Sequence, residues 1–223
     1  MGLGKVSELR NELLKASALK LMRTVANGYT SSPLPEWETF TRNVRLYSYE
    51  KGAVVDRPSH DIMIVLRGGL KLVYDDSHIQ GQIAEFFFTG SVASNSPEPP
   101  WSTTKTSPFS VARYLGSSRR WTAMSLHALE PTTVACFDYR LVCRLASIYP
   151  QWGEAHAAFL WTYIEALFAK LNSMHTKDLP ERYTALMQRH GIKGNVSQRD
   201  VAAYLGVTEA ALSRIVKRVN ERE

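Results

Sequence analysis

The sequence has little cysteine and no long hydrophobic run. Its 223 residues include two cysteines, Cys136 and Cys143, which are too few for a framework of disulfides. No apolar run approaches the roughly 20 residues of a membrane-spanning helix, and the first residues lack the apolar core of a signal peptide. We therefore expect a cytoplasmic protein that makes no contact with a membrane.

Clustered metal ligands and catalytic motifs are also missing. The six histidines are scattered, and no His-x-His pair occurs, although small β-barrel enzymes commonly hold a metal with such a pair, a Glu and a later His. No local Ser-His-Asp or Cys-His arrangement indicates a nucleophile. We expect no catalytic residue and no metal site, with a barrel-fold metal-dependent enzyme as the alternative.

The chain carries an excess of positive charge. Its formal net charge is +6 and its pI is about 9.3, while 44% of the residues are hydrophobic and 22% are charged. These fractions are typical of a globular domain, and the positive charge favours an anionic partner. Residues 181–223 hold eight Lys or Arg against five Asp or Glu, so part of the excess lies near the C-terminus.

Residues 196–219 predict two short helices joined by a glycine turn. Ser197 can cap the first helix, with Asp200 returning toward the cap in a Ser-x-x-acid arrangement. Gly206 supplies the turn with an expected positive φ, and Thr208 caps the second helix. Apolar residues recur at spacings of three and four along one side of both helices. They are Val201, Ala202, Leu205, Leu212, Ile215 and Val219.

The other side of the second helix carries Ser213, Arg214, Lys217 and Arg218. A helix-turn-helix needs this division, because one apolar face packs against its own domain and one basic face enters the major groove of DNA. An ordinary helical hairpin with a solvated charged face is the alternative.

Several short strands are expected before residue 138. Strand-like segments lie at residues 45–49, 53–55, 62–66, 70–74 and 82–88 and within 125–137. We expect residues 62–66 and 70–74 to form a hairpin about Gly68 and Gly69. Short strands with close turns indicate an antiparallel sandwich or barrel. Helices are expected at residues 5–26 and 34–40, and a long loop at residues 94–120.

After Asp138 the apolar period becomes helical. A short helix is expected to about Ile148, and Pro150 starts a longer one that ends near Met174, about 36 Å long. Its apolar surface is broader than one neighbour needs, so one side can cover the barrel and the other a second copy. A long core helix in a monomer is the alternative. The candidate dimer contacts are Trp152, Phe159, Tyr163, Leu167 and Met174.

The segment from Asp178 to Arg182 breaks this helix and starts the next. The expected domains are a barrel with N-terminal helices at residues 1–137, a helical region at 138–177 that can join two copies, and a helix-turn-helix domain at 178–223.

This order of elements resembles the CRP/FNR family of bacterial transcription regulators. The run from Ala202 to Thr208, Ala-Ala-Tyr-Leu-Gly-Val-Thr, and the pair Ser213-Arg214 match family patterns, and the resemblance covers nearly the whole chain. It implies an α+β fold with an N-terminal antiparallel β-barrel of the cupin-like jelly-roll kind. A long dimerisation helix and a C-terminal winged helix-turn-helix would follow.

The resemblance further implies a homodimer that binds double-stranded DNA at a roughly palindromic operator and contacts RNA polymerase. Half-sites would lie about 34 Å apart. Arg214 is the candidate for a bidentate guanine contact, while Ala210 stands where many members carry a Glu. The other candidate DNA-binding residues are Ser197, Arg199, Thr208, Glu209, Ser213 and Lys217, with Lys193 as a further phosphate contact.

The sensor part departs from members of the family that bind cyclic nucleotides. Thr122 stands where their arginine is expected, and Asn95 lies near their glutamate position. Phe86, Arg120 and Thr122 are the candidate effector contacts, and the cofactor is left unknown. Iron–sulfur sensing needs about four cysteine ligands, and the two cysteines of this sequence do not suffice. Open alternatives are a haem on His60, His78, His127 or Cys136, and a redox bridge between the two cysteines.

Overall fold

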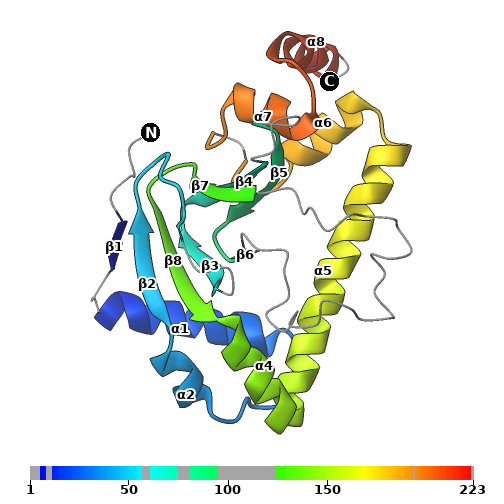
Figure 1. The fold of residues 1–223 in the computed structure, drawn as a ribbon. Coiled ribbons are helices and arrows are strands. Elements are labelled where there is room, and N and C mark those ends of the chain that lie inside the picture. Colours follow the sequence, from blue (N-terminus) through cyan, green and yellow to red (C-terminus); the bar gives the residue numbers. More distant parts are fainter. Residues whose placement is uncertain are drawn as a thin grey trace, which may run out of the picture.

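The computed structural model describes residues 6–8, 12–56, 61–74, 81–94, 124–192 and 194–221. The strands are β1 (Val6–Glu8), β2 (Arg45–Tyr49), β3 (Asp61–Arg67), β4 (Gly69–Tyr74), β5 (Ile83–Phe88), β6 (Val92–Ala93), β7 (Met124–Ala128) and β8 (Thr132–Asp138). The helices are α1 (Glu12–Asn27), α2 (Trp37–Arg42), α4 (Tyr139–Ile148), α5 (Pro150–Thr176), α6 (Leu179–Met187), α7 (Gln198–Leu205) and α8 (Glu209–Asn220). Helices α1, α2 and α4 lie at one end of the sheets, α6 to α8 lie at the other, and α5 runs between the two ends (Figure 1).

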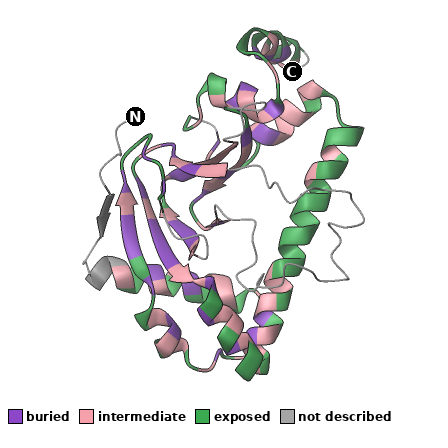
Figure 2. Cartoon of the chain, viewed as in Figure 1, coloured by how far each residue is buried: buried purple, intermediate pink, exposed green. Residues whose placement is uncertain are grey.

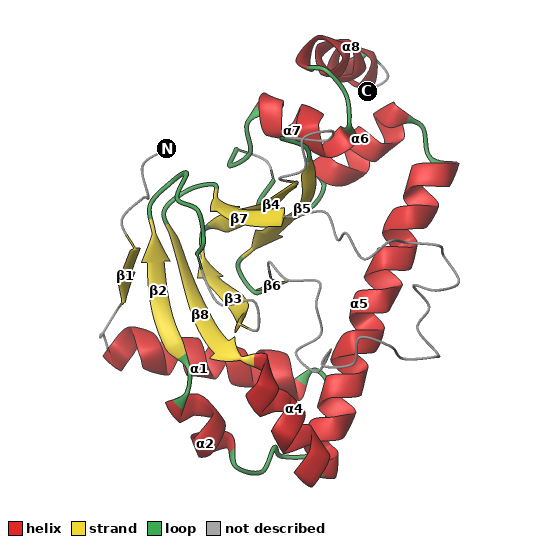
Figure 3. Cartoon of the chain, in the orientation of Figure 1, coloured by secondary structure: helices red, strands yellow, loops and turns green. Residues whose placement is uncertain are grey.

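The strands form two antiparallel sheets (Figure 3). One has the order β1-β2-β8-β3-β6 and the other the order β5-β4-β7. The expected antiparallel architecture is confirmed, but within the described residues the sheets do not close into a barrel. The segment at residues 53–55 contributes a single bridge, from Val54 to His127.

The chain crosses between the sheets at Gly68. The predicted hairpin is wrong, because β3 pairs with β6 and β8 while β4 pairs with β5 and β7. Gly68 has a φ of 86°, and a Cβ there would lie 2.6 Å from Thr132 Oγ1. The Thr132 hydroxyl also accepts from Gly69 N at 3.1 Å and donates to Gly69 O at 3.0 Å. These contacts fix a corner rather than a two-stranded turn.

Side chains of the five-stranded sheet alternate between two cores. Met63 and Val65 point into the space between the sheets, whereas Ile64 packs against α1 and α4. The first helix begins later than expected, since residues 6–8 pair with β2 and α1 starts at Glu12. Likewise α2 begins at Trp37, after Pro35 instead of including it.

Helix α5 changes its surroundings along its length. In its first turns Trp152 and Ala155 are buried, whereas most of its second half is exposed (Figure 2). Trp152 is 4% exposed and donates from Nε1 to Pro35 O at 2.7 Å. Because Trp152 is enclosed by its own chain, it is not available to a second copy, and its assignment to a dimer contact is corrected.

Candidate nucleic-acid interface

Helices α7 and α8 form the expected bihelical corner. Gly206 ends α7 with a φ of 73°, as a left-handed C-cap. The hydroxyl of Ser197 accepts from Asp200 N at 3.1 Å, and that of Thr208 accepts from Ala211 N at 3.2 Å. Both helix starts are thus capped by the predicted residues. Between α6 and the end of α8, the described residues form helices and turns and no strand, so the predicted wing is not seen there.

The two faces of α8 differ as the sequence predicts. Leu212 and Ile215 are buried, whereas Ser213, Arg214 and Lys217 are exposed. Arg214 Nε donates to Ala210 O at a long 3.4 Å, which leaves its guanidinium at the surface. Arg218 is also exposed. The outer face of the helix therefore offers cationic side chains that its own domain does not use for packing.

The remaining candidates lie around the same corner. Ser197, Arg199 and Thr208 are exposed, although the two hydroxyls already serve as caps. Glu209 is exposed in the first turn of α8, where a carboxylate stabilises the positive end of a helix dipole. Lys217 lies 3.8 Å from Glu221, in an exposed pair that contributes little. Lys193 lies outside the described residues.

Asp200 does not return to its cap. Its carboxylate lies 2.6 Å from Lys71 Nζ of β4, and both side chains are largely buried. The expected capping box is therefore wrong, and the acid instead ties α7 to the three-stranded sheet. The partner is 129 positions away in the chain, so local spacing carries no signal of it.

Glu85 makes a second link between the sheet and the helices. Its carboxylate accepts from Arg189, after α6, at 2.7 Å and lies 3.2 Å from Lys170 Nζ of α5. It also accepts from Phe86 N at 2.9 Å. Burial opposes ionisation of Glu85, but the two cations and the hydrogen bonds outweigh it and hold the pKa of Glu85 below its ordinary value.

Aromatic packing completes this junction. Phe86 is 2% exposed and lies 5.2 Å from the Tyr204 ring of α7, and Lys170 Nζ lies 4.8 Å over that ring. The expectation that Phe86 contacts an effector is wrong, because it faces the helix-turn-helix. Residues 83–88 carry apolar side chains on both faces of the strand. This pattern is the sequence signal that the strand packs against the C-terminal helices as well as within its own sheet. Arg120 and Thr122 lie outside the described residues.

The second half of α5 exposes an apolar stripe. Tyr163 is 54% exposed, Leu167 45% and Met174 52%. Phe159 is half-buried and meets Tyr29 edge to face at 5.8 Å, so it contacts its own chain. A contiguous apolar surface of this kind is typical of an interaction site. We call it the α5 stripe: Leu160, Tyr163, Ile164, Leu167, Leu171 and Met174, flanked by Trp161 and Phe168.

Two observations in the described part of the chain concern the alternative sensor chemistries. Burial raises the pKa of the Cys143 thiol, whereas a reactive thiolate needs a lowered one. No three His, Cys, Asp or Glu side chains of these residues gather as metal ligands would. None of the described helices is long and apolar enough to cross a membrane.

The sequence matches no protein-family model and no curated protein. Solved structures with the same architecture include FixK2 from Bradyrhizobium japonicum, at 20% identity and a TM-score of 0.55, with coverage of 80% of this chain and 85% of FixK2. A Eubacterium rectale protein assigned to the CRP/FNR family of transcriptional regulators gives 12% identity, a TM-score of 0.60 and coverages of 86% and 85%. A mutant of CooA from Carboxydothermus hydrogenoformans gives 16% identity and a TM-score of 0.57, with coverage of 87% of each chain.

These similarities define the class of fold. The protein has a two-sheet sandwich, a long connecting helix and a helix-turn-helix in the order found in those structures. Its fold is that of the CRP/FNR-type regulators.

Proposed function

We propose that the protein is a sequence-specific DNA-binding transcription regulator of the CRP/FNR type. The observation that carries this proposal is the outer face of α8, where Arg214, Lys217 and Arg218 are exposed while Leu212 and Ile215 anchor the helix. An α-helix with such a face fits the major groove, where cations reach both phosphates and base edges. The protein acts in the cytoplasm and meets RNA polymerase at the promoter.

Within this face each residue has a distinct role. Arg214 contacts a guanine through O6 and N7, which specifies sequence. Lys217, Arg199 and Thr208 contact phosphates, which sets affinity and register. Ala210 lies between Ser213 and Arg214 on the outer face, so the position where family members often carry a glutamate offers no acceptor to cytosine. The preferred half-site therefore differs from the common one of the family.

The working form is a homodimer joined along the α5 stripe. In a monomer this stripe leaves large side chains in water, including Trp161 at 65% and Phe168 at 66% exposed. Burying a side chain of this size stabilises an association by roughly 1.5–3 kcal/mol. Two copies of α5 packed along their stripes would bring two α8 helices to one face of the DNA.

Regulation is a population shift between two arrangements of the helix-turn-helix relative to the sensor. Residues 176–179 act as the hinge, since α5 ends at Thr176 and Asp178 caps α6 with Glu181 in a capping box. Glu85 and Lys71 hold the arrangement seen here. A signal acts by strengthening or weakening these ion pairs of Glu85 and Lys71.

The signal is not a cyclic nucleotide. Between the sheets the side chains of Met63, Val65, Leu70 and Leu126 are fully buried and make this part of the described core apolar. A cyclic phosphate needs an arginine and free amides, and the sequence has Thr122 and Asn95 at the corresponding positions.

The test is selection from random duplexes followed by substitution. Purified protein should enrich a roughly palindromic site, and Arg214→Ala should lose about 1–3 kcal/mol of discrimination at one base pair of each half-site. Arg144→Ala removes an equally exposed arginine from α4, far from α8 along the chain, and should bind as wild type does. If Arg214→Ala selects the same site with the same affinity, the assignment of α8 is wrong.

A further inference from the structure

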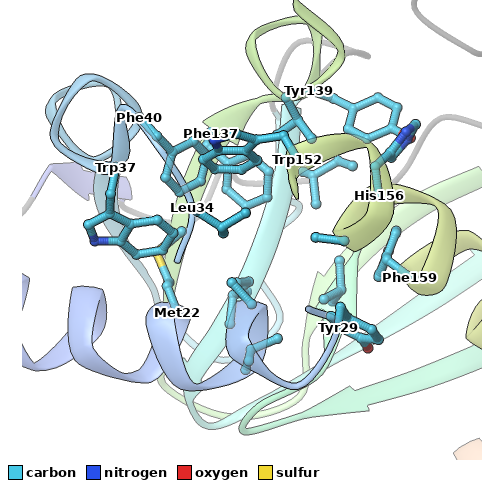
Figure 4. Close-up of a pocket in the computed structure, with 17 residues that line it drawn as sticks. Met22, Tyr29, Leu34, Trp37, Phe40, Phe137, Tyr139, Trp152, His156 and Phe159 are labelled. Carbon is cyan, nitrogen blue, oxygen red and sulfur yellow. The ribbon is translucent and has the colours of Figure 1, made fainter. Parts of the chain in front are cut away.

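An apolar cavity of about 100 Å³ lies where the N-terminal helices meet the start of α5. Its walls come from α1, α2, β3, β6, β8, α4 and α5, and Figure 4 shows the aromatic side chains that surround it. Ile64 of β3 lines the cavity, whereas Met63 and Val65 point to the other face of the same sheet. The cavity is therefore separate from the space between the two sheets.

Aromatic rings supply much of the wall. At one end Trp37 and Trp152 stack 6.2 Å apart, and Phe40 lies 5.2 Å from Trp152. At the other end Tyr29 meets Phe159 edge to face (Figure 4). Ring faces and edges presented from several sides suit another aromatic ring, which prefers offset-stacked and edge-to-face contacts.

The described lining holds no Asp, Glu, Lys or Arg side chain. Its polar groups include Tyr139 and His156, which are hydrogen-bonded to each other through the hydroxyl and Nε2. Burial, with a smaller contribution from Cys143, raises the pKa of Tyr139 to about 12. Burial also lowers the pKa of His156 below its ordinary value of 6.5. Both groups are uncharged at neutral pH, so the cavity offers no counter-charge to an ion.

We propose that this cavity binds a small uncharged molecule built on a single aromatic ring. An apolar cavity of about 150 Å³ binds benzene. The present cavity, at about 100 Å³, is smaller, so it holds at most one ring, seated by small shifts of the surrounding side chains, and excludes larger ring systems. Protein interiors are close-packed, and wall atoms around a void lack contact partners. A bound ring restores those contacts, whereas a charged ligand loses its hydration without compensation.

The position of the cavity gives the ligand a route to the rest of the molecule. Trp152, Ala155 and Phe159 of α5 form part of its wall, and the same helix continues into the α5 stripe and Lys170. Occupancy therefore acts on the helix that joins the sensor to α6. This regulatory consequence rests on the proposed function, whereas binding itself does not.

Calorimetric titration of the full chain with phenol tests the site without any DNA. Phenol should bind with saturation, and benzoate, which adds a charge to the same ring, should bind at least about tenfold more weakly because its desolvation is not compensated. No saturable binding of phenol, or equal binding of benzoate, would overturn the proposal. A failure of DNA binding leaves this result untouched, so the two proposals fail separately.

Two matched substitutions in α1 test whether phenol binds in the cavity. Ala26 lines it, whereas Ala16 is exposed on the same helix. Ala26→Leu fills part of the volume and should lower the affinity for phenol at least about tenfold, while Ala16→Leu should leave it unchanged. Undiminished affinity in Ala26→Leu would overturn the assignment.

Crystals of the wild-type protein soaked with 4-bromophenol supply a test that does not depend on a variant folding. The anomalous signal of bromine should appear beside Trp152 and Phe159. A signal only between the two sheets or on the surface would contradict the proposed site.

Discussion

At the scale of single residues, Glu85 has an unusual position. Its carboxylate contacts Lys170 and Arg189, so one side chain of the three-stranded sheet meets both the long helix and the segment that follows α6. All three side chains are partly solvated, between 27% and 41% exposed. The contribution of the cluster to stability is therefore moderate, which suits contacts that open in the proposed regulation.

Glu85→Gln should weaken the packing of the helix-turn-helix on the sensor by about 1–2 kcal/mol at neutral pH, because an amide cannot neutralise two cations. Urea unfolding should give a lower free energy of unfolding, and amide hydrogen exchange in α7 should be faster. Glu38→Gln breaks the exposed 3.5 Å pair with Arg42 and serves as the control that changes neither quantity.

The dependence of this effect on pH has a definite sign. The pKa of Glu85 lies below its ordinary value of 4.5, so its ionisation stabilises the folded state above pH 4.5 and this contribution is lost as pH falls through the lowered pKa. The difference between wild type and Glu85→Gln should therefore shrink at acid pH. A difference that stays constant from neutral to acid pH would show that charge at Glu85 is not responsible.

Predictions for individual residues succeeded where the cause is local. Ser197, Gly206 and Thr208 act within one or two turns of their own helices, so spacing alone predicts their caps and turn. The predictions failed for Asp200 and Phe86, whose partners Lys71 and Tyr204 are distant in the chain. Nothing in a local pattern distinguishes a carboxylate that caps its helix from one that reaches another domain.

At the scale of elements, α5 has two functions along one helix. Trp152 and Ala155 in its first turns are buried against the N-terminal part of the chain, and farther along the helix Lys170 reaches Glu85 of the sheet. The sequence predicted the length of α5 and the breadth of its apolar surface. It could not predict which turns are covered within the chain, because that depends on how α1 and α2 pack.

Strand pairing shows the same limit. The segments for β2, β3, β4 and β5 were predicted from alternation and turns, close to their observed bounds. The partner of β3 was wrong, because a Gly-Gly turn is compatible with a hairpin and with a corner between sheets. The pairing of β3 with β6 and β8, and of β4 with β5 and β7, distinguishes them.

Tyr163→Asp should convert the proposed dimer into monomers, since it places a charge within the α5 stripe. Sedimentation should show the loss, and operator affinity should fall by about 10²–10⁴, because each half-site is then bound without its linked partner. Thr162→Asp introduces the same charge on the exposed opposite side of α5 and should leave the dimer intact. Unchanged sedimentation of Tyr163→Asp would exclude the stripe as the interface.

At the scale of the whole molecule, the two proposed binding sites lie at opposite ends. The cavity lies at the α1 and α2 end and α8 lies at the other, with α5 between them (Figure 1). The sequence predicted this order of parts because each part has its own periodicity. It did not predict the cavity, whose walls come from seven elements brought together only by folding.

Hydroxyl-radical footprinting on the selected duplex tests the central claim most directly. A dimer that places two α8 helices in successive major grooves should protect two equivalent patches on one face of the DNA, with centres about 34 Å, or one helical turn, apart. One patch without a symmetric partner, or no protection at protein concentrations that saturate the duplex, would contradict a dimeric regulator that reads DNA through α8.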